Sequence, residues 1–234
     1  MNYDATEHEY MDLKAQFNAE EVISAGLNPP SYPARPSKGG VPMGMAWQKM
    51  RHDDVIYTPK YNGWRVLLHV PSGMCHNRKL EPLTISEEFE EAIYRIQKCC
   101  PHDIEWLDCE GLERRHGIGK GSLIVLDFIP TQHLNEETLD ITYEDRQTVL
   151  AVTLDKVDDL DVMSQPKEDS VYFAPHYNNH EVEVLDSMLK SRNEIWDAEF
   201  YEGWVGVKLG SKYPIQLVGE DKKATGWTKH RWDS

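Results

Sequence analysis

The chain has 234 residues, 40% of them hydrophobic and 28% charged, with a formal net charge of −15 at pH 7. These values suit a globular protein of one large domain or two small ones. No apolar run is long enough to cross a bilayer, and the acidic start Met1–Asp4 is not followed by the apolar region of a secretory signal. We therefore expect a cytoplasmic protein with no membrane partner.

Charge is distributed unevenly along the chain. Acidic residues gather near the N-terminus and over residues 153–170, whereas Lys and Arg gather between Lys208 and Arg231. A negative net charge taken alone argues against a nucleic-acid ligand. A basic cleft on an acidic exterior is nevertheless compatible with a polyanionic substrate. The four cysteines show neither CxxC nor zinc spacing, and we interpret them as reduced thiols.

The first predicted element is a helix over residues 6–25, which Asn28-Pro29-Pro30 would end. Residues 31–40 are rich in Pro, Gly, Ser and Lys and indicate a linker. We therefore place a domain boundary here. Residues 1–44 would form an N-terminal helical segment with its linker, and residues 45–234 the main domain.

The next segment is the heptapeptide Pro59-Lys60-Tyr61-Asn62-Gly63-Trp64-Arg65. Strand patterns precede it over residues 53–58 and follow it over residues 66–70, and Asn62-Gly63 is a turn signal. Lys60 is thus predicted at a strand–turn–strand junction. A lysine acts as a nucleophile only after losing its proton, which burial or a nearby cation such as Arg65 would favour. An ordinary hairpin with an exposed lysine is the other interpretation.

The remaining elements mix helices and strands without a regular βαβ alternation. Helices are predicted over 86–99, around 143–153 and over 181–191, and strands over 104–112 and 122–129. The last third otherwise alternates β-branched and aromatic residues with turns. This order favours an α+β fold of largely antiparallel sheets flanked by helices.

Four further segments carry side chains suited to a nucleotide. They contain Arg78 with Thr84, Asp108 with Glu110, Glu202 with Gly203 and Lys208, and Lys229 with Arg231. A nucleoside triphosphate needs cations for its phosphates, carboxylates for Mg²⁺ and a nucleophile in line with one phosphorus. Taken singly, the carboxylates could be solvated strand residues and the last two cations an exposed tail. Together, in this order, they indicate a nucleotide site.

These motifs resemble those of the covalent nucleotidyltransferase superfamily, which includes ATP-dependent DNA ligases, RNA ligases and mRNA-capping guanylyltransferases. The family's K-x-D-G-x-R motif corresponds to Lys60–Arg65, its D-G-E motif to Asp108–Glu110, and its E-G-x-V-x-K motif to Glu202–Lys208. Its terminal K-x-K motif corresponds to Lys229 and Arg231, and its aspartate-ended strand to Leu123–Asp127. The resemblance covers roughly residues 45–232, and is strongest to the adenylyltransferase domain of an ATP-dependent polynucleotide ligase.

The resemblance implies an ATP-grasp-like nucleotidyltransferase domain that uses ATP and Mg²⁺ to seal a nicked DNA or RNA duplex, as in DNA repair. Lys60 would carry AMP, which passes to a 5′-phosphate and is then displaced by a 3′-hydroxyl. Glu202 and Glu110 would bind the metal. The implied nucleotide-binding residues are Arg65, Arg78, Glu110, Phe128, Lys208, Lys229 and Arg231, with Phe128 or Trp106 as candidates for stacking on adenine.

The sequence departs from the family pattern in several places. Asn62 replaces an aspartate and Cys109 a glycine. The segment from Glu202 to Lys208 is one residue longer than usual, and we expect a bulge at Gly206 to absorb the difference. No C-terminal OB barrel follows Arg231. Residues 1–44 or a protein partner would compensate, unless the sequence is a minimal enzyme or part of a longer chain.

Two alternatives stay open at this point. A GTP-dependent RNA-capping guanylyltransferase would use the same lysine chemistry. The other alternative is a non-catalytic nucleotide-binding module of the same fold, in which Asn62 and Cys109 would be signs of lost activity.

Overall fold

The computed structural model describes ten stretches of the chain. They are residues 32–33, 35–38, 54–77, 81–83, 89–100, 104–112, 117–129, 141–213, 215–216 and 223–232. The helix expected over residues 6–25 lies outside these stretches, and so do Arg78 and Thr84. Within them, no helix is both long and apolar enough to cross a membrane.

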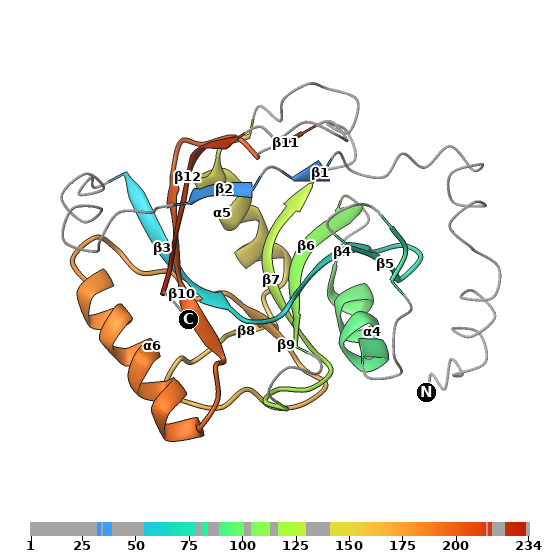
Figure 1. Cartoon of the computed structure of the whole chain (residues 1–234). Helices are drawn as coiled ribbons and strands as arrows, with labels where there is room; N and C mark the ends of the chain where they lie inside the picture. Colours follow the sequence, from blue (N-terminus) through green and yellow to red (C-terminus); the bar gives the residue numbers. More distant parts are fainter. Residues whose placement is uncertain are drawn as a thin grey trace.

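Two main sheets form the fold, and most of their strand pairs are antiparallel (Figure 1). The four-stranded sheet has the order β2 (Arg35–Lys38), β12 (Lys223–Arg231), β10 (Tyr201–Lys208) and β3 (Val55–Tyr61). The six-stranded sheet has the order β5 (Met74–His76), β4 (Trp64–His69), β6 (Trp106–Leu112), β7 (Ser122–Ile129), β9 (Val171–Phe173) and β8 (Asp158–Asp159). A separate pair joins β1 (Tyr32–Pro33) to β11 (Ile215–Gln216). All strands of the described stretches belong to these sheets, so none of them forms an OB barrel.

Among the described residues, three helices cover the sheets: α4 (Glu90–Cys99), α5 (Tyr143–Thr153) and α6 (Val182–Trp196). Figure 1 shows α6 beside the four-stranded sheet and α4 beside the six-stranded one. α5 begins where Thr142 accepts a hydrogen bond from the backbone of Asp145, as an N-cap residue does. All three predicted helices in this part are confirmed. α6 runs beyond the predicted end, to a left-handed residue at Asp197.

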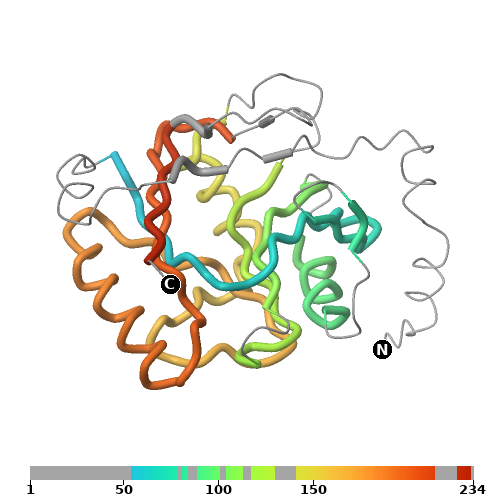
Figure 2. Tube along the Cα trace, in the orientation of Figure 1, coloured from blue at the N-terminus to red at the C-terminus, as the bar shows by residue number. Residues whose placement is uncertain are grey.

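The segment expected as a linker instead contains two short strands. β1 pairs with β11, and β2 pairs in parallel with β12, so residues 35–38 join the sheet that holds β10 and β3 (Figure 1). The Cα trace in Figure 2 shows β12 running beside β10 in this sheet. Pro33 and Pro36 of this segment are compatible with strands, although prolines in a sequence usually indicate a linker. An edge strand tolerates proline because only one side of it donates to a neighbour, and β2 is an edge strand.

The chain passes from one sheet to the other at Asn62-Gly63. The predicted strand–turn–strand order is confirmed, but the two strands do not form a hairpin, because β3 pairs with β10 and β4 pairs with β6. The turn packs tightly against β6. A Cβ atom added at Gly63 would lie 2.6 Å from the carbonyl oxygen of Gly111. Only glycine can therefore occupy this position without displacing β6.

Three apolar clusters of described residues hold the sheets and helices together. One lies between the six-stranded sheet and α4 with α5, and includes Leu107, Val125, Phe128, Ile93, Ile96 and Leu150. A second joins α6, the four-stranded sheet and the end of β6, and includes Tyr57, Trp204, Leu185, Leu189 and Leu112. A small third cluster holds Leu67, Trp106, Ile129 and Tyr213.

One ion pair is fully buried between β7 and α5. The Nε and Nη2 atoms of Arg146 donate to the two carboxylate oxygens of Asp127 at 2.8 and 3.0 Å. Neither side chain is exposed to solvent. Nη1 of Arg146 also donates to the carbonyl of Ile141, which ties the start of α5 to the sheet.

We expect Arg146→Leu to destabilise the fold by about 3–5 kcal/mol, because it leaves the buried carboxylate of Asp127 without its partner. Arg95→Leu is the matched control. Its guanidinium pairs with Glu91 on the helix surface and is 51% exposed, so its loss should cost roughly 0–1 kcal/mol. Urea unfolding of both variants measures the difference. The double variant Arg146→Leu/Asp127→Leu should recover part of the loss, and a double variant no more stable than the single one would contradict this explanation.

Candidate nucleotide-binding site

Lys60 lies near the end of β3, opposite Gly203 on β10, which in turn lies opposite Arg231 on β12. Residues directly opposite each other in a sheet share a face. The next row on this face contains Thr58, Val205 and Lys229. The register therefore gathers Lys60, Lys229 and Arg231 on one face of the four-stranded sheet.

A β-bulge brings a carboxylate to this face. The register between β10 and β3 shifts between Tyr201 and Gly203, so Glu202 is the extra residue. Gly203 has a φ of 141°, a conformation that strongly favours glycine. Oε2 of Glu202 accepts from Nζ of Lys60, and Oε1 accepts from Nη2 of Arg231 at 2.9 Å. One carboxylate thus links the candidate nucleophile to a cation of the neighbouring strand.

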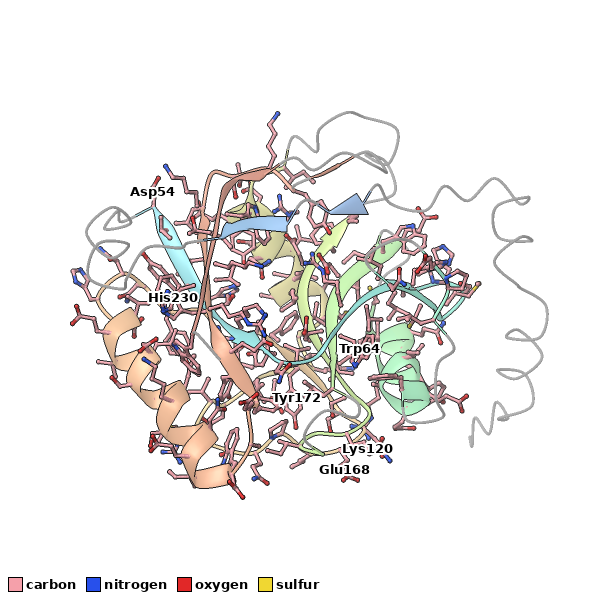
Figure 3. All side chains as sticks on the ribbon, in the orientation of Figure 1. Asp54, Trp64, Lys120, Glu168, Tyr172 and His230 are labelled. Carbon is pink, nitrogen blue, oxygen red and sulfur yellow. The ribbon has the colours of Figure 1, made fainter. Side chains whose placement is uncertain are left out.

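Lys208 does not join this group, contrary to the sequence prediction. The bulge expected at Gly206 is absent, since the register with β3 is regular from Gly203 to Lys208. Lys208 therefore lies opposite Val55, on the other face of the sheet. Its Nζ atom is 3.8 Å from a carboxylate oxygen of Asp54, the residue that Figure 3 labels just before β3. The alternate position on the site face holds Val207.

The six-stranded sheet contributes Arg65 and Asp108. Nε and Nη2 of Arg65 donate to Oδ1 and Oδ2 of Asp108, in the parallel two-bond arrangement that guanidinium and carboxylate groups favour. Burial alone would lower the pKa of Arg65, but Asp108 raises it above the usual value. The side chain of Asp108 is only 1% exposed, and the hydroxyl of Tyr213 donates to its Oδ2 at 2.7 Å.

Glu110 lies opposite Arg65 on the same face of this sheet. Its Oε1 accepts a 2.9 Å hydrogen bond from the backbone of Gly63. Burial raises the pKa of Glu110 to about 7, while Lys60, Arg65 and the Gly63 amide oppose the rise. Glu110 and Glu202 therefore reach the Lys60–Gly63 turn from different sheets.

Phe128 lies away from the site. It is opposite Leu107, on the face of the six-stranded sheet that α4 covers, and is only 3% exposed in the first apolar cluster. The prediction that its ring contacts adenine is therefore not supported by its position. Cys109 faces the same cluster, which explains how a side chain replaces the family's glycine without entering the site. Trp106 is on the site side but is fully buried in the third cluster.

Asn62 is anchored by hydrogen bonds from its side-chain amide and its backbone nitrogen. Nδ2 donates to the carbonyl of Glu199 at 2.9 Å, and the backbone nitrogen donates to the carbonyl of Phe200 at the same distance. An aspartate carboxylate could accept but not donate at this position. The departure from the family motif thus ties the Lys60 turn to the segment that leads into Glu202.

Two contacts near the site involve residues outside the predicted motifs. Tyr213, which binds Asp108, follows β10 in a turn segment without strand or helix periodicity. Trp232 donates from Nε1 to Asp186 of α6 at 2.8 Å and so fixes the end of β12 next to Arg231. Neither position belongs to a motif with recognisable spacing, and an aromatic residue near a run of cations was the only signal.

The carboxylates fit a magnesium ion in part. Within the described stretches, no three His, Cys, Asp or Glu side chains are placed to hold a metal together. Mg²⁺ usually takes only one or two protein carboxylates, with water and substrate phosphates completing its shell. Glu202 and Glu110, on either side of the Lys60 turn, supply donors of the right kind and number for that arrangement.

No protein-family model and no curated protein sequence matches this chain. Solved structures do match it. The ligase domain of LigD from M. tuberculosis is 12% identical with a TM-score of 0.53, over 86% of this chain and 59% of that one. A mycobacterial DNA ligase D complexed with ATP and MES is 13% identical with a TM-score of 0.54, over 86% and 60%. The Chlorella virus DNA ligase-adenylate is 14% identical with a TM-score of 0.51, over 87% and 69%.

The chain spans between about half and two thirds of the length of the solved chains that it matches. At these identities the similarity concerns the fold. It agrees with the α+β architecture of two mainly antiparallel sheets flanked by helices. The chain therefore has the nucleotidyltransferase-domain fold of ATP-dependent ligases.

Proposed function

We propose that this protein is an ATP-dependent polynucleotide ligase that works through a covalent lysyl-AMP intermediate on Lys60. The observation that supports it most is the contact of Lys60 with Glu202 at the junction of the two sheets, with Arg231 on the same carboxylate. A lysine that is 23% exposed, beside a carboxylate and facing further cations, is accessible to a triphosphate. The matched fold adds support of a general kind.

In the first step, neutral Nζ of Lys60 attacks the α-phosphorus of ATP. A P–N bond forms, the bond from that phosphorus to the oxygen bridging to the β-phosphate breaks, and pyrophosphate leaves. Glu202, whose carboxylate already contacts Nζ, accepts the proton that Nζ loses. Lys229 and Arg231, on the same sheet face, balance the charge that develops on pyrophosphate.

In the later steps, AMP moves from Lys60 to a 5′-phosphate of a nicked strand, and a 3′-hydroxyl then displaces AMP. Positioning and electrostatics supply most of the rate in such transfers. Arg65, held by Asp108, would bind the nucleotide, and Arg78 would assist. When bound at Glu202 and Glu110, Mg²⁺ would neutralise phosphate charge. Phe128 and Lys208 have no part in this proposal, since both face away from Lys60.

A GTP-dependent guanylyltransferase is the second candidate. The Thr58-Pro59-Lys60 lead-in and the Arg78–Thr84 segment look more like those of DNA ligases, which favours ATP and strand sealing. A panel of nicked DNA, RNA and hybrid duplexes, each supplied with ATP or GTP, separates the substrates.

We expect α-labelled ATP to label the protein covalently and Lys60→Ala to abolish the label, because no other group would supply the attacking nitrogen. Lys98→Ala is the matched control. Lys98 lies in the last turn of α4, over the ring of Tyr94, and should leave labelling unchanged. Denaturing gel electrophoresis after a timed incubation measures both. Labelling or sealing by Lys60→Ala at the wild-type rate would refute the mechanism, and labelling by GTP alone would favour the capping alternative.

The burial of Glu110 predicts a pH-dependent stability. Its pKa is about 7 in the folded state and about 4.5 when unfolded, so the folded protein holds this proton more tightly. The stabilisation is present below about pH 4.5 and is lost as pH rises through 7. Relative to Glu110→Gln, wild type should therefore lose on the order of 2 kcal/mol between pH 5 and pH 8. Urea unfolding across this range measures it, with the exposed Glu91→Gln as control. Parallel curves for wild type and Glu110→Gln would refute the assignment.

We also propose that the segment before the main domain contributes to the site through β2, which borders β12. A chain lacking residues 1–30 keeps both N-terminal strands and should label as the full chain does. A chain lacking residues 1–40 removes the neighbour of β12 and should label more slowly. Equal labelling and sealing by the full chain and both truncated chains would exclude a role for this segment.

A further inference from the structure

A buried hydroxyl reaches the six-stranded sheet from the segment that follows β10. We propose that Tyr213 is a positioning residue, which orients Arg65 for nucleotide binding by fixing the carboxylate of Asp108. This inference rests on the proposed function of the site. It assigns a role to a residue that lies outside every motif of the sequence.

The contacts at Asp108 define the role. Oδ1 accepts from Nε of Arg65, while Oδ2 accepts from both Nη2 of Arg65 and the hydroxyl of Tyr213. The carboxylate is almost completely buried, so a lost protein donor is not readily replaced by water. Burial and then Asp108 raise the pKa of Tyr213 well above its usual value. Tyr213 therefore stays protonated and acts as a donor to Asp108.

The ring of Tyr213 is held firmly. It packs with Leu67, Trp106 and Ile129 in the third apolar cluster. On another side lies Arg146, whose guanidinium carbon is 5.5 Å from the ring centroid of Tyr213 and 5.6 Å from that of Tyr143. Because Arg146 is itself fixed by Asp127, the hydroxyl of Tyr213 has little freedom to follow a moving carboxylate.

The backbone around Tyr213 is anchored as well. The amide of Tyr143 donates to the carbonyl of Ser211 at 2.7 Å, and the amide of Glu144 donates to that of Leu209 at 3.1 Å. The first turn of α5 thus holds the segment that leaves the four-stranded sheet. Through Tyr213, this segment reaches Asp108 in the six-stranded sheet, so the contact links the two halves of the site.

Tyr213→Phe removes only the hydroxyl. Oδ2 of Asp108 would then keep Nη2 of Arg65 as its donor, and the guanidinium–carboxylate pair could tilt as a unit. We expect the half-saturating ATP concentration for covalent labelling to rise roughly ten-fold, since small misplacements of a binding group have large effects. The maximal labelling rate should change much less, because Tyr213 does not touch the reacting atoms.

A double-mutant cycle tests whether the effect passes through Arg65. In an Arg65→Lys background, Tyr213→Phe should change the half-saturating ATP concentration by less than about two-fold, because the oriented group is already lost. Tyr201→Phe is the matched control, since its buried hydroxyl has no hydrogen-bond partner among the described residues. It should alter neither value. Unchanged labelling by Tyr213→Phe, or an equal effect in both backgrounds, would overturn the proposal.

A second measurement covers the case in which Arg65→Lys does not label. In arginine-labelled protein, the Nε–Hε signal of Arg65, assigned by its absence in Arg65→Lys, should exchange with water faster in Tyr213→Phe than in wild type or Tyr201→Phe. Equal exchange would refute the positioning role. Wild type that never labels would instead count against the proposed function, while the exchange experiment still tests the contact.

Discussion

The crossing of the chain between two sheets within two residues is the constraint on which the candidate site depends. β3 ends at Tyr61 and β4 begins at Trp64 in the other sheet, so a single tight turn joins them. The turn is possible because Gly63 leaves room for β6, and its amide donates to Glu110. As a result, Lys60 and Arg65 are close in sequence but belong to different sheets. A ligand that contacts both spans the junction.

Three cations of the site already have a carboxylate partner. Lys60 and Arg231 share Glu202, and Arg65 is paired with Asp108. The cations of this site are therefore held in ordered ion pairs, in a chain whose formal net charge is −15. In the proposed reaction, the phosphates of ATP compete with Glu202 for Lys60 and Arg231. Asp108 differs from Glu202 because it is almost fully buried. Its pair with Arg65 therefore persists when a ligand binds, and it fixes the orientation of the Arg65 guanidinium.

Local patterns predicted the elements well. The bounds of β7 and α5 match the sequence prediction, because a continuous apolar run and a cap are local signals. Lys60, Asp108, Glu110 and Glu202 were identified from short motifs with fixed spacing. Pairing between distant segments was not predictable in this way. The junction of β3 and β4 resembles a hairpin in sequence, and the pairing of β2 with β12 joins the two ends of the described chain.

The wrong prediction for Lys208 comes from the position of a strand irregularity, and such irregularities also shape the site. The bulge at Glu202 turns its carboxylate toward Lys60, and the regular register beyond it sends Lys208 to the opposite face. A second shift, between Asp108 and Cys109 on β6, leaves Asp108 directly opposite Asp127 of β7. Like charges in this arrangement destabilise a sheet unless each is neutralised.

Two arginines from outside these strands provide the neutralisation: Arg65 for Asp108, and Arg146 for Asp127. One of these pairs stabilises the fold, and the other holds the arginine that we propose to bind the nucleotide. Tyr213 contacts both, through its ring and its hydroxyl. Because two carboxylates share one buried region, the charge that fixes α5 on the sheet and the charge that orients Arg65 are not independent. A substitution at either pair is therefore felt at the other.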